Sequence, residues 1–286
     1  MAARAQRSRR PPAAELDRKF LTGVARAFAG AVIFALPMLM TMEMWWIGFY
    51  IDPWRLALLL IVQVPLLTAL SHFSGFMETK GWLDDVLDAF VAIAVAAVAA
   101  TVILFVLSVI DFDTALHEAV GKVAIQTFPA SIGAMLARKQ LAGSQDDDKP
   151  SAGDDPTTYA GEMFLMAVGA LFLGLNVAPT EEMVLLSYMM TPWHEIGLVS
   201  LSLAAMHGFV YAAEFRGRPQ PLPDTSFVSL FLRFTVAGYA LVLVICLYLL
   251  WTFGRTDGAG LQEMVSAVVV LGFPCAIGAA AARLIL

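Results

Sequence analysis

One segment of the chain is written twice. Residues 116–138 recur as residues 261–283, and 11 of the 23 aligned positions are identical. An earlier pair of segments, residues 30–54 and 169–193, shares a Thr-x-Glu-Met sequence followed by a Pro-Trp pair. Because both matches run in the same order, the sequence is a tandem duplication, a pattern found in membrane transporters.

The duplicated units are apolar enough to lie in a membrane. Hydrophobic residues make up 59% of the chain and charged residues only 15%, whereas soluble domains have about 25% charged residues. Long stretches with few charges predict membrane-spanning helices, since no alternating barrel pattern occurs. We predict an all-α integral membrane protein of eight transmembrane helices, arranged as two parallel tandem four-helix repeats. The predicted spans are 24–47, 54–75, 86–110, 117–137, 162–179, 195–213, 227–252 and 262–285.

Basic residues predict the orientation of these spans. With eight spans both termini share one side, and that side carries fifteen of the 18 Lys and Arg residues. The positive-inside rule therefore places both termini in the cytoplasm, with the protein in the inner (plasma) membrane. We expect no removable signal peptide, because no short apolar segment with a cleavage site follows the basic amino terminus.

The predicted spans and the composition of the remaining segments divide the chain into four parts. A basic cytoplasmic segment (1–23) precedes the first repeat (24–139). An acidic stretch rich in Gly, Ser and Pro (140–161) predicts a flexible cytoplasmic linker, and the second repeat (162–286) follows it. An even number of spans in each repeat inserts both repeats in the same direction.

Two glutamates at equivalent positions are the first candidates for an ion site. Glu43 and Glu182 lie near the outer ends of spans one and five, and each follows a threonine, Thr41 or Thr180. A carboxylate within a span costs at least about 2.5–3.5 kcal/mol, so it usually faces a partner or a cavity. Related by the repeat, the two carboxylates would converge and bind a cation or share a proton. The alternative is that both lie among headgroups at helix ends.

Three further acids accompany this pair. Glu118 and Glu263 are equivalent and start spans four and eight, where either the helix dipole or an ion-site role accounts for them. Glu181 has Met42 as its counterpart, so it would add an asymmetric ligand. The sequence leaves the identity of any metal unknown.

Prolines interrupt several spans. Phe128-Pro129 and Phe273-Pro274 occupy equivalent positions near the bilayer centre, and small residues follow both pairs. They predict either a central packing seam or a broken helix that gates an ion path. His207, inside a span, is a candidate proton relay, with a satisfied packing histidine as the alternative.

Two family resemblances follow from these motifs. The TEEM and MTPWHE segments and the repeated Phe-Pro helix resemble a bacterial multi-pass integral membrane family with no assigned function, over roughly residues 20–286. Glu181-Glu182 is loosely similar to the motif of CAAX-type intramembrane proteases. That family has arginine and phenylalanine where this chain has Leu186 and Leu203, so the protease pattern is incomplete.

The leading hypothesis is a transporter or channel for a small cation or proton that uses Glu43 and Glu182. The alternatives are a non-transporting scaffold, such as an assembly or stress factor, and an intramembrane hydrolase in which Glu181 approaches His207. We expect no enzymatic activity, no cofactor and no nucleic-acid partner. The expected partners are the lipid bilayer, a small cation or proton, and a second copy of the chain.

Overall fold

The computed structural model describes residues 13–73, 81–140, 159–212, 228 and 231–285, which contain helices and no strands. In chain order the elements are α1 (Ala13–Leu39), α2 (Met42–Tyr50), α3 (Pro53–Phe73), α4 (Trp82–Val106), α5 (Leu116–Gln140), α6 (Tyr159–Val177), α7 (Glu181–Met189), α8 (Pro192–Ala212), the π-helix η1 (Phe231–Val236), α10 (Ala237–Thr252) and α11 (Leu261–Ile285). The predicted all-α class is confirmed for these residues.

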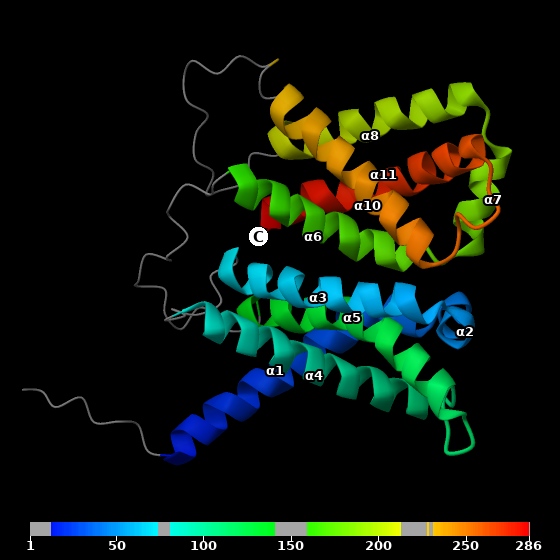
Figure 1. The fold of residues 1–286 in the computed structure, drawn as a ribbon. Helices are drawn as coiled ribbons and strands as arrows, with labels where there is room; N and C mark the ends of the chain where they lie inside the picture. The colour runs from blue at the N-terminus through cyan, green and yellow to red at the C-terminus, as the bar shows by residue number, and fades with distance from the viewer. Residues whose placement is uncertain (1–12, 74–80, 141–158, 213–227, 229–230, 286) are drawn as a thin grey trace, which may run out of the picture.

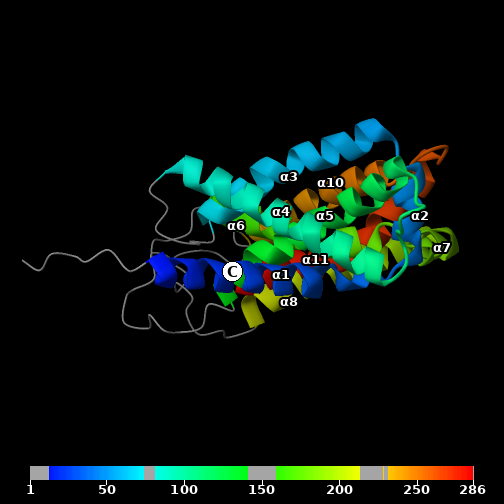
Figure 2. The ribbon, with the colours of Figure 1, turned by 90° about the horizontal axis from the view of Figure 1, so that it is seen from below.

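The helices form two halves that lie side by side (Figure 1). Helices α1–α5 make up the N-half, and helices α6–α11 make up the C-half. The start of α1 and the end of α11 lie at the same end of the bundle, the terminal end (Figure 1). The short helices α2 and α7 lie at the opposite end, the distal end (Figures 1 and 2).

Seven helices in the described part of the chain are long and apolar enough to cross a membrane. They are Leu21–Leu39, Pro53–His72, Trp82–Val106, Leu116–Ala137, Tyr159–Val177, Phe231–Thr252 and Leu261–Arg283. Helix α8, the predicted sixth span, has 21 residues but is not among them. The fully described part of α8 ends at residue 208, which leaves it shorter than the other seven.

The predicted first span is wrong at its carboxyl end. Helix α1 ends at Leu39 and a separate helix begins at Met42, so residues 24–47 are not one helix. The fifth span ends in the same way, because α6 stops at Val177 and α7 starts at Glu181. A proline lies beside each break, Pro37 in the last turn of α1 and Pro179 in the link before α7.

Close helix crossings hold each half together. A Cβ atom on Gly30 of α1 would lie 2.5 Å from the carbonyl oxygen of Gly133 in α5. In the C-half, a Cβ atom on Gly169 of α6 would lie 2.1 Å from the carbonyl oxygen of Gly278 in α11. Small residues thus let α5 and α11 each contact the first helix of its half, as in other membrane bundles.

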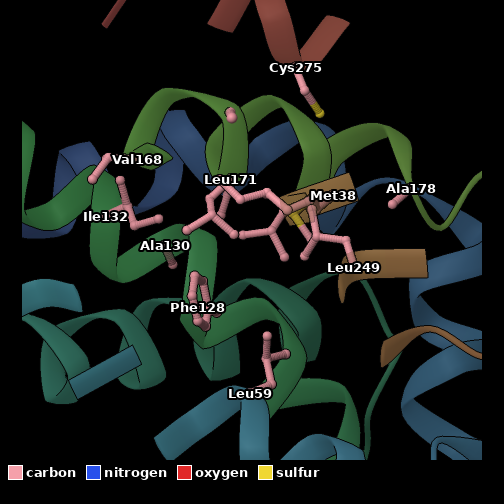
Figure 3. Close-up of a cluster of buried hydrophobic side chains, with 14 of the residues drawn as sticks. Met38, Leu59, Phe128, Ala130, Ile132, Val168, Leu171, Ala178, Leu249 and Cys275 are labelled. Carbon is pink, nitrogen blue, oxygen red and sulfur yellow. The ribbon is translucent and has the colours of Figure 1, made fainter. Parts of the chain in front are cut away.

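The two halves share one apolar core. Leu59, Phe128 and Ile132 of the N-half lie in the same cluster as Leu171 and Leu249 of the C-half (Figure 3). Between the halves the packing involves mainly α1, α3 and α5 on one side and α6 and α10 on the other. It includes the edge-to-face pair of Phe34 and Phe172, whose ring centroids are 5.1 Å apart.

Candidate functional site: a groove in the C-half

Glu43 and Glu182 occupy matching positions in the two halves. Each lies in the first turn of a short distal helix, Glu43 in α2 and Glu182 in α7. Helix α2 packs on α5, whereas α7 packs on α11, so the two carboxylates belong to separate contacts (Figure 1). The helix dipole favours an acid in this first turn without any bound ion.

Thr41 and Thr180 form hydrogen bonds at the two helix breaks, between α1 and α2 and between α6 and α7. The Thr41 hydroxyl donates a hydrogen bond to the Pro37 carbonyl oxygen, and the Thr180 hydroxyl donates to the Val177 carbonyl oxygen at 2.8 Å. Both bonds satisfy carbonyl groups that the end of a helix leaves without intrahelical partners. The threonines therefore have a structural task in both halves.

Glu118 and Glu263 have local partners as well. The Glu118 carboxylate forms an ion pair of 2.5 Å with Lys122, whose ammonium group also donates to the Val109 carbonyl oxygen at 3.0 Å. The Glu263 carboxylate accepts the backbone N–H of Gly260 at 3.0 Å, at the start of α11. An ion pair thus accounts for Glu118 and helix capping for Glu263, and Glu181 is exposed in the first turn of α7.

A groove of about 840 Å³ lies between α7, α8 and α11. Its walls are mostly apolar and include Met183, Leu186, Leu201, Phe273 and Pro274. Three polar side chains also line it, those of Thr180, Glu182 and His194. Of the candidates from the sequence, the groove thus brings together Thr180, Glu182, Phe273 and Pro274, whereas Glu43 does not line it.

Two serines of α7 and α11 replace glycines of the N-half. In the N-half, α2 contacts α5 through Gly48 and Gly121, where a Cβ atom on Gly121 would lie 2.1 Å from the Gly48 carbonyl oxygen. The sequence-equivalent residues in the C-half are Ser187 and Ser266, both buried. Neither serine lines the groove, but a serine at such a contact excludes the close backbone approach that Gly48 and Gly121 allow.

The Phe-Pro pairs lie inside unbroken helices. Helix α5 runs from Leu116 to Gln140 through Pro129, and α11 runs from Leu261 to Ile285 through Pro274. Phe128 is fully buried in the core, whereas Phe273 is half-buried in the wall of the groove. The packing alternative thus accounts for Phe128, and the two helices expose no break.

His207 lies toward the terminal end of α8. Its Nδ1 atom is 2.9 Å from the Thr235 hydroxyl, and its ring lies 5.2 Å from the ring of Phe231 in η1. Fifteen residues of α8, or about 22 Å, separate His207 from the distal start of that helix. Glu181 begins the distal helix α7, so the geometry gives no support to a joint hydrolytic site.

The sequence analysis missed a carboxylate beside the groove. Glu195 in the first turn of α8 accepts a hydrogen bond from the buried Ser266 hydroxyl of α11. The neighbouring His194 bonds to Thr191 through its Nδ1 atom. Both residues belong to the MTPWHE segment. The first repeat has Arg55 and Leu56 at these positions, so a comparison of the two repeats does not select His194 or Glu195.

No group of three or more His, Cys, Asp or Glu side chains in the described regions is arranged to hold a metal ion. Among the residues that line the groove, the exposed Glu182 carries the one carboxylate, and most of the others are apolar. Such a site suits an organic cation with an apolar body better than a bare inorganic ion, which prefers several oxygen ligands.

Comparisons with known proteins agree with the membrane class. A family described as "Putative integral membrane protein (DUF2391)" matches residues 23–286. The comparisons with curated proteins and with solved structures give no match.

Proposed function

Because the chain belongs to this DUF2391 family of integral membrane proteins, we propose that it binds and moves an amphipathic organic cation across the plasma membrane. The proposal includes eight spans in two parallel repeats, with both termini in the cytoplasm. Helix α8 supplies the eighth span, since it has the same 21-residue length as α3, its counterpart in the sequence repeat.

The groove is the observation that carries the proposal. Its volume of about 840 Å³ lies within the range of small-molecule sites, roughly 300–1,000 Å³. Apolar walls would cover the body of the ligand, and the Glu182 carboxylate would neutralise its charge. Exposed Leu186 and Leu201 at the groove provide an entry for a ligand that partitions into the bilayer.

Transport of a bare cation or proton by Glu43 and Glu182 together has less support, because only Glu182 lines the groove. Glu118 and Glu263 each have a partner within the protein, which favours a structural role over ion binding for these two residues. Parallel repeats commonly move against one another during transport, and the limited packing between the halves is compatible with such movement.

Binding of a lipophilic cation to the protein in nanodiscs tests the proposal. We expect tetraphenylphosphonium to bind, and Glu182→Gln to raise the dissociation constant by about tenfold, or 1.4 kcal/mol. Glu181→Gln is the matched control, because this adjacent, exposed acid does not line the groove. Equal losses in both variants, or no loss in Glu182→Gln, would remove the groove from the mechanism.

Proteoliposome flux then separates the functions. Uptake of the lipophilic cation that depends on Glu182 supports a transporter, whereas binding without uptake supports a receptor or scaffold. Proton or potassium flux that falls in both Glu43→Gln and Glu182→Gln would instead favour the paired-glutamate mechanism.

A further inference from the structure

A second, smaller pocket lies where the two halves meet at the distal end. Its volume is about 200 Å³, and we call it the interhalf pocket. Residues of the N-half line one side of it, and residues from the end of α10 and the loop that follows it line the other. They include Tyr50, Asp52 and Arg55 from the first group and Thr252, Arg255 and Asp257 from the second.

Arg55 joins the halves across this pocket. Its guanidinium group donates to both carboxylate oxygens of Asp257, at 2.9 and 2.7 Å, and to the Trp251 carbonyl oxygen at 2.9 Å. The guanidinium also lies 5.0 Å from the centre of the Trp251 ring. The Arg55 charge is therefore compensated within the protein.

Arg255 has no comparable compensation. Its Nη2 atom donates to the Pro179 carbonyl oxygen, which is a neutral acceptor. Its Nε atom is buried without a hydrogen-bond partner, and no carboxylate of the described residues forms an ion pair with it. A half-buried guanidinium with a free buried N–H normally has an anionic partner.

The nearby carboxylates do not fill this role. Asp257 is engaged by Arg55, and Asp52 accepts the backbone N–H groups of Trp54 and Arg55 at the start of α3, at 2.8 and 3.2 Å. The residue equivalent to Arg255 in the first repeat is Ile110, so the repeated helices do not need a cation at this position. The bond to the Pro179 carbonyl oxygen gives Arg255 a place in the fold, but this neutral acceptor leaves the charge of the guanidinium uncompensated.

We propose that the interhalf pocket binds a small oxyanion, a phosphate group, on Arg255. The planar guanidinium fork matches phosphate oxygens, and the pocket has room for one phosphate and a few waters of about 30 Å³ each. Because both halves line the pocket, the bound anion stabilises their contact at the distal end. This inference does not depend on the groove or on transport.

Thermal unfolding of the full-length protein in phosphatidylcholine nanodiscs tests the site. Inorganic phosphate is titrated against chloride at constant ionic strength, and we expect a saturable rise in the unfolding temperature. Arg255→Gln should raise the half-saturating phosphate concentration by about tenfold or more. Lys122→Gln is the control, because it removes a charge outside the pocket.

The lipid arm of the experiment identifies the source of the phosphate. If phosphatidylglycerol nanodiscs stabilise the protein in an Arg255-dependent way and inorganic phosphate does not, the ligand is a lipid headgroup. If Arg255→Gln does not fold, Arg255→Lys replaces it in the experiment. This variant keeps the positive charge but loses the planar guanidinium, so it should bind the phosphate group more weakly. No Arg255-dependent stabilisation by either source would overturn the proposal.

Discussion

The contact of α2 with α5 and the contact of α7 with α11 use equivalent parts of the repeated sequence, but they differ in closeness. Gly48 and Gly121 bring the backbones of the N-half together. Ser187 and Ser266 replace them in the C-half, where a groove of about 840 Å³ lies beside α7 and α11. We therefore expect side-chain size at these two positions to distinguish the close contact of the N-half from the contact beside the groove.

The two halves also differ in the donors that bond to the carbonyl groups at the helix breaks, after α1 in the N-half and after α6 in the C-half. In the N-half, the Trp45 indole donates to the Leu39 carbonyl oxygen at 2.8 Å, and Gln126 donates to the Met38 carbonyl oxygen at 3.0 Å. The residues equivalent to Trp45 and Gln126 are Val184 and Leu271, which cannot donate. Arg255 from a distant loop caps the C-half break instead, through Pro179. In the N-half, helix residues donate to the carbonyl groups at the break, whereas in the C-half the donor comes from a loop beside the interhalf pocket.

The largest effect should come from placing a serine in the close contact of the N-half. A Cβ atom on Gly121 would overlap the Gly48 carbonyl oxygen, so Gly121→Ser must push α2 away from α5. We expect a loss of about 3 kcal/mol in unfolding free energy, at the upper end of overpacking costs, measured by tryptophan fluorescence in detergent. Gly23→Ser is the control, because no atom lies within 4 Å of its added Cβ. Equal stability of the two variants would show that the glycine contact is not close.

The indole cap of the N-half should have the next largest effect. Trp45→Phe keeps most of the ring but leaves the Leu39 carbonyl oxygen without this donor, and we expect a loss of about 1–2 kcal/mol. The adjacent Trp46→Phe makes the same chemical change on an exposed side chain and should alter stability by less than about 0.5 kcal/mol. Chemical unfolding of both variants in the same detergent measures the difference. A similar loss in both would attribute it to ring size rather than to the cap.

The sequence predicted the features that the repeat shares. Helical class and the small residues after the Phe-Pro pairs, near Gly133 and Gly278, both follow from patterns within single segments. The groove was not predictable in this way, because it arises where the repeats differ, at Gly48 and Ser187. Contacts such as Arg55 with Asp257 join residues 202 positions apart, and no local pattern encodes them.

The paired glutamates show the same limit. Their shared position suggested a shared site, but equivalent residues of parallel repeats meet only if they face the axis between the halves. Helix α2 packs on α5 and α7 packs on α11, and the convergence of the two acids stays a prediction. The end of the first span was not predictable from hydropathy either, because the apolar segment continues past the break between α1 and α2.

A smaller effect should follow from closing the groove. Ser187→Gly lets α7 approach α11 as α2 approaches α5, and we expect it to weaken tetraphenylphosphonium binding by about tenfold, or 1.4 kcal/mol. Ser187→Ala keeps the Cβ atom and loses only the hydroxyl bond to the Val184 carbonyl oxygen, so it should bind within about twofold of the unmodified protein. Nanodisc binding measures both variants. Similar affinities for the two would show that side-chain size at this position does not set the width of the groove.

The smallest effect should come from the ion pair between the halves. The hydrogen bond from Arg55 lowers the pKa of Asp257 below its ordinary value, so the folded state favours the ionised carboxylate. The stabilisation is therefore complete at neutral pH and is lost as the pH falls through the lowered pKa. Because Asp257 is 58% exposed, we expect Asp257→Asn to cost less than about 1 kcal/mol at pH 7. Thermal unfolding of the unmodified protein and of Asp257→Asn is followed from pH 7 downward, and their melting temperatures should converge in acid. The control is Asp113→Asn, which changes another exposed acid at the distal end and should melt like the unmodified protein at pH 7. A difference that persists unchanged in acid would mean that Asp257 stabilises the halves by packing rather than by its charge.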